Sequence, residues 1–243
     1  MKVLLTRPQG RNQSMIEALS ERQIPFVVSP LLEVVATDDI KNPAAIAAFN
    51  HADMVIFIST NAVEYAAKAL NNQFPHSVSY FAVGKATFEA LASLGVKATE
   101  APQDCQQTEG LLTLSELQRL DGKQITIVRG VGGREALADQ LQTRGANVSY
   151  WQVYQRAAPT IDPLLPQSWQ QQDIDTIVVT SGEILSNLVT LVPKELFDWL
   201  LACHIIVPSE RVYNQAQQAG FTRITNAQAA NSHAVLSALG LAN

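Results

Sequence analysis

The chain is poor in cysteine. Its 243 residues include only Cys105 and Cys203, and neither has a second thiol or a histidine at ligand spacing. A structural disulfide is therefore not expected, and the sequence favours a cytoplasmic protein. The histidines are scattered as well, with no second ligand at helical or turn spacing, which predicts surface or core positions rather than a metal site. They are His51, His76, His204 and His233.

Long apolar runs are absent too. The first one ends after three residues at Arg7 and Pro8, which is too short for a signal peptide, and no later run approaches a membrane span. Charged residues make up 16% of the chain, and the net charge is −5. This balance argues against nucleic acid and anionic membranes as partners. It leaves room for a small anionic ligand, because helix N-termini and a few arginines create a local positive field.

The sequence also lacks the common signatures GxxxxGK[ST], HExxH, GxSxG and CxxC. Residues 130–133, Gly-Val-Gly-Gly, follow a predicted strand and precede a predicted helix, as a dinucleotide-binding turn would. Their third glycine falls one position early, and no acidic residue near position 150 is placed to bind a ribose hydroxyl. We interpret the segment as a tight turn whose backbone N–H groups could hold a carboxylate, and we expect neither cofactor nor metal.

An internal repeat dominates what the chain does contain. A shift of 122 residues takes Arg7 to Arg129, and each arginine follows a short apolar run. The same shift takes Asp53 to Asp175, and each aspartate opens another apolar run. The period is too long for a solenoid, so we interpret it as duplication of a domain-sized unit. Two similar lobes would form a cleft, where ligands commonly bind.

Short apolar strands alternate with amphipathic helices along the chain, and several helices are followed by glycine. The pattern predicts an α/β protein of two similar flavodoxin-like lobes, each a parallel sheet flanked by helices. The predicted strands are 2–6, 26–29, 53–58, 79–83, 124–128, 147–151, 175–180 and 203–207. The predicted helices are 13–22, 62–70, 85–94, 134–144, 185–191 and 211–219.

Two extended segments, 30–35 and 151–156, fall outside this rhythm and occupy corresponding places in the repeat. We interpret them as a two-stranded crossover ladder between the lobes. One lobe then combines residues 1–31 with 158–243, the other spans 37–152, and the linkers are 32–36 and 153–157. A plain tandem arrangement is the alternative.

Hydroxyl and glycine residues stand just after the predicted strands. Each opens a predicted helix, so helix capping alone explains any one of them. Together they lie at the carboxyl ends of parallel strands, where open α/β sheets bind ligands. Arg7 and Arg129 hold the same kind of position and are either solvated or anion-binding. The candidate binding residues are Arg7, Ser59, Thr60, Gly84, Thr87, Arg129, Ser181, Gly182 and Ser209.

At this point the chain resembles the uroporphyrinogen-III synthase family. The best discriminators are Val83-Gly84-Lys85-Ala86-Thr87 and Val153-Tyr154-Gln155-Arg156. The segments that carry the resemblance cover nearly the whole chain in the family's order: 4–8, 57–63, 82–87, 128–130, 133–137, 153–156, 179–182 and 207–211. The resemblance implies two α/β lobes joined by a two-stranded ladder, with the first lobe built from both chain ends.

The resemblance also implies the substrate and the chemistry. The substrate would be hydroxymethylbilane, a linear tetrapyrrole that loses water, forms a spiro intermediate and closes with its last ring inverted. No cofactor or metal would be needed, and the enzyme would be a cytoplasmic monomer; a hand-over of substrate from the preceding pathway enzyme stays open. The family places at Tyr154 a tyrosine proposed to act as general acid, and the hydroxyl residues above would hold substrate carboxylates. A phenol suits that role, because its ordinary pKa near 10 keeps it protonated at neutral pH.

Two other classes of protein share these features. A two-lobed binding protein without chemistry would have the same repeat and crossovers, although the missing signal peptide and Tyr154 count against it. A two-lobed transferase with a nucleotide-activated donor is disfavoured by the failed glycine motif. For Tyr154 itself, packing in the crossover is the alternative to catalysis. Fold alone does not separate these three functions.

Overall fold

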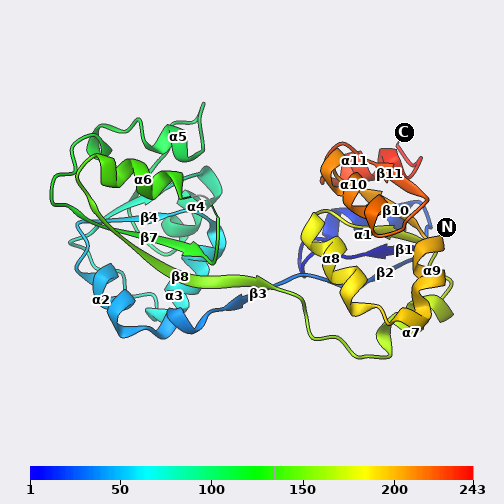
Figure 1. Cartoon of the computed structure of the whole chain (residues 1–243). Coiled ribbons are helices and arrows are strands. Elements are labelled where there is room, and N and C mark those ends of the chain that lie inside the picture. The colour runs from blue at the N-terminus through cyan, green and yellow to red at the C-terminus, as the bar shows by residue number, and fades with distance from the viewer. Residues whose placement is uncertain (134, 243) are drawn as a thin grey trace. The chain divides into compact units, whose positions relative to one another are not determined.

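The structure is a computed structural model that describes residues 1–133 and 135–242. These residues form two compact units. Unit 1 contains Met1–Glu33 and the chain from Ala157 onward, and unit 2 is Val34–Arg156. Each unit is a sheet flanked by helices, which confirms the predicted α/β class (Figure 1). Arg134, where one predicted helix begins, lies outside the described residues.

Unit 1 has a five-stranded sheet in the order β11-β10-β9-β1-β2, in which all the paired neighbours are parallel. One face packs against α7 to α10 and the other against α1 and α11. The strands are β1 (Val3–Leu5), β2 (Phe26–Val28), β9 (Thr176–Val178), β10 (His204–Val207) and β11 (Ile224–Asn226). The helices are α1 (Gln13–Glu21), α7 (Leu165–Gln171), α8 (Gly182–Leu191), α9 (Phe197–Ala202), α10 (Glu210–Gln218) and α11 (Ser232–Ala238), with the 3-10 turn η3 (Lys194–Leu196).

Unit 2 has a six-stranded sheet in the order β3-β8-β7-β4-β5-β6. Helices α2 to α4 cover one face, and α5 and α6 cover the other. The strands are β3 (Glu33–Ala36), β4 (Met54–Phe57), β5 (Ser79–Ala82), β6 (Ala98–Glu100), β7 (Gln124–Gly130) and β8 (Asn147–Ala157). The helices are α2 (Pro43–Asn50), α3 (Thr60–Ala69), α4 (Lys85–Ser93), α5 (Thr108–Leu111) and α6 (Ala136–Thr143), with the 3-10 turns η1 (Asp38–Lys41) and η2 (Ser115–Leu117).

The helices form where the sequence places an apolar stripe. In α1 the buried residues are Met15 and Leu19, four apart, and the same spacing separates Val212 and Ala216 in α10. Four positions place two side chains on one helix face, so each helix presents that face to its sheet. Gly95, Gly145 and Gly220 follow α4, α6 and α10 with positive φ, the backbone conformation that ends a helix most readily at glycine.

Both sheets share one strand order once the repeat is followed. Counted from β1 in unit 1 and from β7 in unit 2, each reads 2-1-3-4-5, and unit 2 adds β3 beside β8. That order is the flavodoxin-like one, and its chain order reverses between strands 1 and 3. The reversal falls between β1 and β9 in unit 1 and between β7 and β4 in unit 2. Ligands bind at the carboxyl ends of such strand pairs.

The segment from 147 to 157 differs from its predicted division into a strand and a separate crossover. It forms one strand, β8, of eleven residues, drawn as a single long green ribbon in Figure 1. No glycine or proline interrupts the sequence before Pro159, so nothing ends the ladder with β7 at residue 151. Its register shifts between Arg129 and Gly130 of β7, which pair with Gln152 and Tyr154. The strand therefore carries a bulge at Val153.

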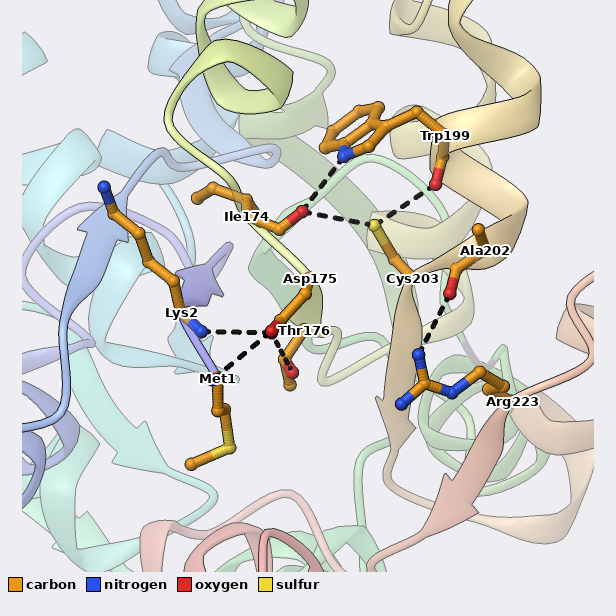
Figure 2. A network of polar contacts seen from close by, with 9 residues as sticks. All are labelled: Met1, Lys2, Ile174, Asp175, Thr176, Trp199, Ala202, Cys203 and Arg223. Carbon is orange, nitrogen blue, oxygen red and sulfur yellow. Dashed lines mark hydrogen bonds and ion pairs between the residues drawn. The ribbon is translucent and has the colours of Figure 1, made fainter.

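The repeated aspartates join strand ends at the amino edge of each sheet. In unit 2 the Asp53 carboxylate accepts from the Gln124 amide at 2.8 Å and pairs with the Lys123 ammonium at 3.0 Å. In unit 1 the Asp175 carboxylate accepts from the Lys2 amide at 3.0 Å, as Figure 2 shows. The repeat thus preserves a contact that starts the central strand pair of each sheet.

Asp53→Asn is expected to remove an acid-sensitive part of the stability of unit 2. The hydrogen bond from the Gln124 amide, followed by that from Lys123, lowers the pKa of Asp53 in the folded protein. A lowered folded-state pKa adds stability that is present above the ordinary value near 4 and is lost as the pH falls through the folded value. The urea midpoint measured from pH 6 to 2.5 should therefore fall less steeply in Asp53→Asn than in the exposed control Asp104→Asn. Equal slopes would contradict this role.

No helix in the described part of the chain is long and apolar enough to cross a membrane. The same residues contain no group of three or more histidine, cysteine, aspartate or glutamate side chains placed to hold a metal ion. Cys105 and Cys203 are both free thiols.

Candidate active site

In both units the predicted residues follow strands that are neighbours in the sheet. In unit 2, β4 pairs with β5 on one side and with β7 on the other, all parallel. In unit 1, β9 pairs with β1 and β10 in the same way. Parallel pairing brings the residues after these strands together at the carboxyl ends of the strands. In each sheet these ends include the strand pair at which the chain order reverses.

A side-chain hydrogen bond joins two of the predicted residues, Ser59 and Tyr154. The two hydroxyl oxygens are 3.0 Å apart, although the residues are 95 positions apart in sequence. Ser59 is the N-cap of α3, and its Oγ accepts from the Ala62 amide at 3.1 Å. The phenol of Tyr154 thus lies at the N-terminus of a ten-residue helix, where the backbone N–H groups create a positive potential.

The Tyr154 ring is held by close packing. Only 9% of the residue is exposed, and its ring centroid lies 6.0 Å from that of Tyr65. On β7, a Cβ added at Gly130 would lie 2.5 Å from Cε2 and 2.6 Å from Cζ of Tyr154. Only glycine therefore leaves room for this ring. The sequence resemblance marks Gly130, but its contact with Tyr154 emerges only from the bulged pairing of β7 with β8.

Arg129 is buried and bound by neighbouring side chains and a backbone carbonyl. The residue is 3% exposed, its Nη1 pairs with the Glu135 carboxylate at 3.1 Å, and its guanidinium also donates to the carbonyl of Gly132. The guanidinium carbon lies 4.9 Å from the centre of the Tyr150 ring, and the Tyr150 hydroxyl donates to Glu135. This hydrogen bond from Tyr150 is the main cause that lowers the pKa of Glu135, while burial raises the pKa of Tyr150 to about 12.

Gly84 and Thr87 lie at the start of α4. Gly84 is the N-cap and its carbonyl accepts from the Thr87 amide at 3.0 Å, while the Thr87 residue is buried. The Lys85 amide at this helix start donates to Oε1 of Gln106 at 3.1 Å. A side-chain amide oxygen thus already accepts a hydrogen bond from one of the backbone N–H groups at the start of α4. No pattern in the sequence singles out Gln106 for this contact.

In unit 1, Ser181 and Ser209 are the N-caps of α8 and α10. The Ser181 Oγ accepts from the Ile184 amide at 3.2 Å, whereas the Ser209 side chain makes no capping hydrogen bond. Gly182 is buried under the side chain of Gln215, which donates to the Gly182 carbonyl at 3.0 Å. Ser209 therefore has the more available hydroxyl of the two serines.

Arg7 follows β1 and is only partly buried. Its guanidinium donates to the carbonyl of Arg11 at 3.4 Å and to that of Ala230. Burial lowers the pKa of Arg7 from its ordinary value. The two arginines of the repeat thus differ, because within residues 1–133 and 135–242 Arg129 is enclosed with a carboxylate and Arg7 bonds only backbone carbonyls.

Among the described residues, two of the cavities lie in unit 2. A cavity of about 170 Å³ lies past the carboxyl ends of β4, β5 and β7 and is lined by Ile58, Val83, Arg129 and Tyr150, among others. A larger one, about 610 Å³, is lined by Phe74, Tyr80 and Val96 near the opposite, amino ends of β5 and β6. Size alone would select the second, yet none of the predicted residues lines it. The first cavity is favoured as the site, because it lies past the carboxyl ends of the strands.

Residues 13–236 match the family model described as uroporphyrinogen-III synthase HemD. The chain is 35% identical over 98% of its length to the whole uroporphyrinogen-III synthase of Escherichia coli, and 36% identical, also over 98%, to the whole enzyme of Salmonella typhimurium.

Solved structures agree on the fold. The uroporphyrinogen-III synthetase of Helicobacter pylori is 16% identical, with a TM-score of 0.61 over 99% of this chain and 98% of that one. A mutant uroporphyrinogen III synthase of Thermus thermophilus is 14% identical, with a TM-score of 0.55 over 99% of both chains. At these identities the likeness concerns the fold alone. The family model and the two curated relatives go further and show that this chain belongs to the uroporphyrinogen-III synthase family, whose members are cyclising lyases of tetrapyrrole biosynthesis.

Proposed function

We propose that the protein cyclises hydroxymethylbilane, with loss of water and inversion of the last pyrrole ring through a spiro intermediate. The observation that carries the proposal is the Tyr154 hydroxyl, held 3.0 Å from the Ser59 hydroxyl at the start of α3. A phenol in a fixed position can donate its hydrogen in the first step, in which a hydroxyl must leave as water.

The remaining work is positioning and charge stabilisation. The departing hydroxyl leaves a cationic azafulvene, and the last ring must attack it through its substituted carbon rather than its free one. Groups that hold the substrate's acetate and propionate arms would fix that geometry and so select one isomer. In unit 2 we assign this role to the backbone N–H groups at the start of α3, beside Ser59 and Thr60, and to the start of α4 at Gly84 and Thr87.

In unit 1 the corresponding groups are Ser181, Gly182 and Ser209, each at or beside a helix N-terminus. Arg7 adds positive charge at the end of β1. We assign a different role to Arg129: its guanidinium, paired with Glu135 and stacked on Tyr150, supports the turn after β7 and adds to the local field. A buried arginine with a carboxylate partner has little left to offer a second carboxylate.

Neither step requires a cofactor by its chemistry, because departure of water and attack by a pyrrole carbon change no oxidation state. We further propose that the protein is a cytoplasmic monomer that takes its substrate as a free small molecule or from the enzyme that makes it.

The isomer produced tests the function. Hydroxymethylbilane generated enzymatically is supplied to the purified protein, and the oxidised products are separated as type I and type III isomers. Since the substrate closes spontaneously to type I, we expect type III to appear only with the protein and in proportion to it. Type I alone, formed at the spontaneous rate, would contradict the function, and substrate binding without type III would favour a binding protein instead.

A further inference from the structure

Ser59 makes one contact that its repeat partner does not need. A shift of 122 residues takes Ser59 to Ser181, and both are N-caps with nearly the same backbone, φ −161° and ψ 160° against φ −158° and ψ 159°. Both accept a capping hydrogen bond from the residue three positions on, at 3.1 and 3.2 Å. Only Ser59 adds a tyrosine hydroxyl at 3.0 Å, because the same shift relates Tyr154 to Leu32, which has none. Capping alone therefore does not account for Ser59.

The hydrogens in this contact can be counted. The Ser59 Oγ already accepts from the Ala62 amide, so its own hydrogen is free to be donated. The Tyr154 Oη has one hydrogen as well, and only one of the two hydrogens can lie between the two oxygens. If serine donates to tyrosine, the phenol keeps its hydrogen for another acceptor. If tyrosine donates to serine, that hydrogen is used within the protein.

We propose that Ser59 is a positioning residue for Tyr154: it donates to the phenol oxygen, leaving the phenol hydrogen directed at the substrate hydroxyl. This inference rests on the proposed function. The Tyr154 hydrogen goes to the leaving hydroxyl, the bond from carbon to that oxygen breaks, and water departs. The phenolate that results is stabilised by the Ser59 hydrogen and by the N-terminus of α3. The pyrrole carbon that gives up its hydrogen during ring closure releases the proton that restores the phenol.

The geometry around the pair supports a relay of fixed direction, in which Ser59 donates to Tyr154 and Tyr154 donates to the substrate. Gly130 and Tyr65 confine the Tyr154 ring, and the capping bond to Ala62 fixes the Ser59 rotamer. Neither side chain can turn away without losing packing or a cap. A bond between two confined groups keeps its direction through the reaction, which is what a preorganised donor requires.

Steady-state kinetics of Ser59→Ala separate positioning from substrate binding. If Ser59 acts through Tyr154, kcat should fall about tenfold, the value of one well-placed hydrogen bond, while KM stays within about twofold. Ser59→Thr keeps the hydroxyl and the cap and should recover most of kcat. A raised KM with unchanged kcat would overturn the proposal and make Ser59 a carboxylate-binding residue.

A double-mutant cycle gives the sharper test. In Tyr154→Phe, where the acid hydroxyl is absent, adding Ser59→Ala should lower kcat by less than about twofold. Ser181→Ala in the same background is the matched comparison, because it removes the equivalent cap but no contact with tyrosine; its effect on kcat should be the same with or without the phenol. A full tenfold loss from Ser59→Ala in both backgrounds would refute the relay.

Unfolding measurements on the same variants test the hydrogen bond independently of the function. Removing either hydroxyl should leave the other partner unpaired, so the unfolding equilibrium constants of the cycle should show a coupling of about fivefold. Asn42→Ala, which removes the cap of α2 in the same unit, should show no coupling with Tyr154→Phe. Coupling together with type I product alone would leave the bond standing and refute the function; no coupling together with type III product would refute the relay only.

Discussion

Replacing Tyr154 by phenylalanine is expected to lower kcat about 10²-fold while leaving the fold intact. The ring stays between Gly130 and Tyr65, so packing is preserved, and only the hydroxyl beside Ser59 is lost. Without a positioned proton donor, the substrate hydroxyl must leave with a proton from water. The measurement is the initial rate of type III formation at saturating substrate, corrected for spontaneous closure.

Tyr80→Phe is the matched control for this substitution. Tyr80 is buried in the same unit, and its hydroxyl donates to the carbonyl of Pro75 near the amino edge of the sheet, away from the strand ends of the site. Its kcat should stay within about twofold of the wild-type value. If Tyr154→Phe lowered kcat by less than about threefold, the phenol would not be the acid and positioning of the substrate would dominate.

Gly130→Ala is expected to damage both stability and catalysis. The added Cβ would lie 2.5 Å from the Tyr154 ring, closer than real atoms pack, so the ring or the strand must move. Overpacking of this kind costs about 1 to 3 kcal/mol of unfolding free energy. Because Cζ, which carries the hydroxyl, is also within 2.6 Å of that Cβ, the same shift displaces the hydroxyl and should lower kcat at least about tenfold.

Gly130→Ala in a Tyr154→Ala background tests whether the clash with the ring causes the loss of stability. In Tyr154→Ala, where the ring is absent, Gly130→Ala should cost less than about 0.5 kcal/mol in urea unfolding, since its backbone conformation needs no glycine apart from this contact. Equal costs in the two backgrounds would show that alanine disturbs β7 by another route.

Most of the fold could be predicted from the sequence, because the signals for strands and helices are local. Apolar runs bounded by Asp53 and Asp175 became β4 and β9, and the stripe of Met15 and Leu19 became the buried face of α1. The missed strands β6 and β11 have three residues each and mix polar with apolar side chains. Their place at the sheet edges follows from backbone pairing with β5 and β10, which leaves little trace in so short a segment.

The candidate site was predicted less completely. The positions of Ser59, Ser181 and Ser209 followed from strand ends that open helices, a local pattern. The surroundings of Arg129 did not, because its burial depends on Glu135 and Tyr150 packing around it. A strand-end arginine looks the same in sequence whether it faces solvent or a carboxylate.

The sequence by itself determined the repeat, the α/β class, the family and the strand ends at which the candidate residues stand. Only the tertiary structure decided how Tyr154 is presented. Adjacent residues of a regular strand face opposite sides, yet Val153 and Tyr154 pack in the same core cluster because the bulge in β8 shifts the register. That shift sets Tyr154 over Gly130 and within 3.0 Å of Ser59. Periodicity specifies which residues form a strand, but register depends on every neighbour along the sheet, and the register placed the phenol.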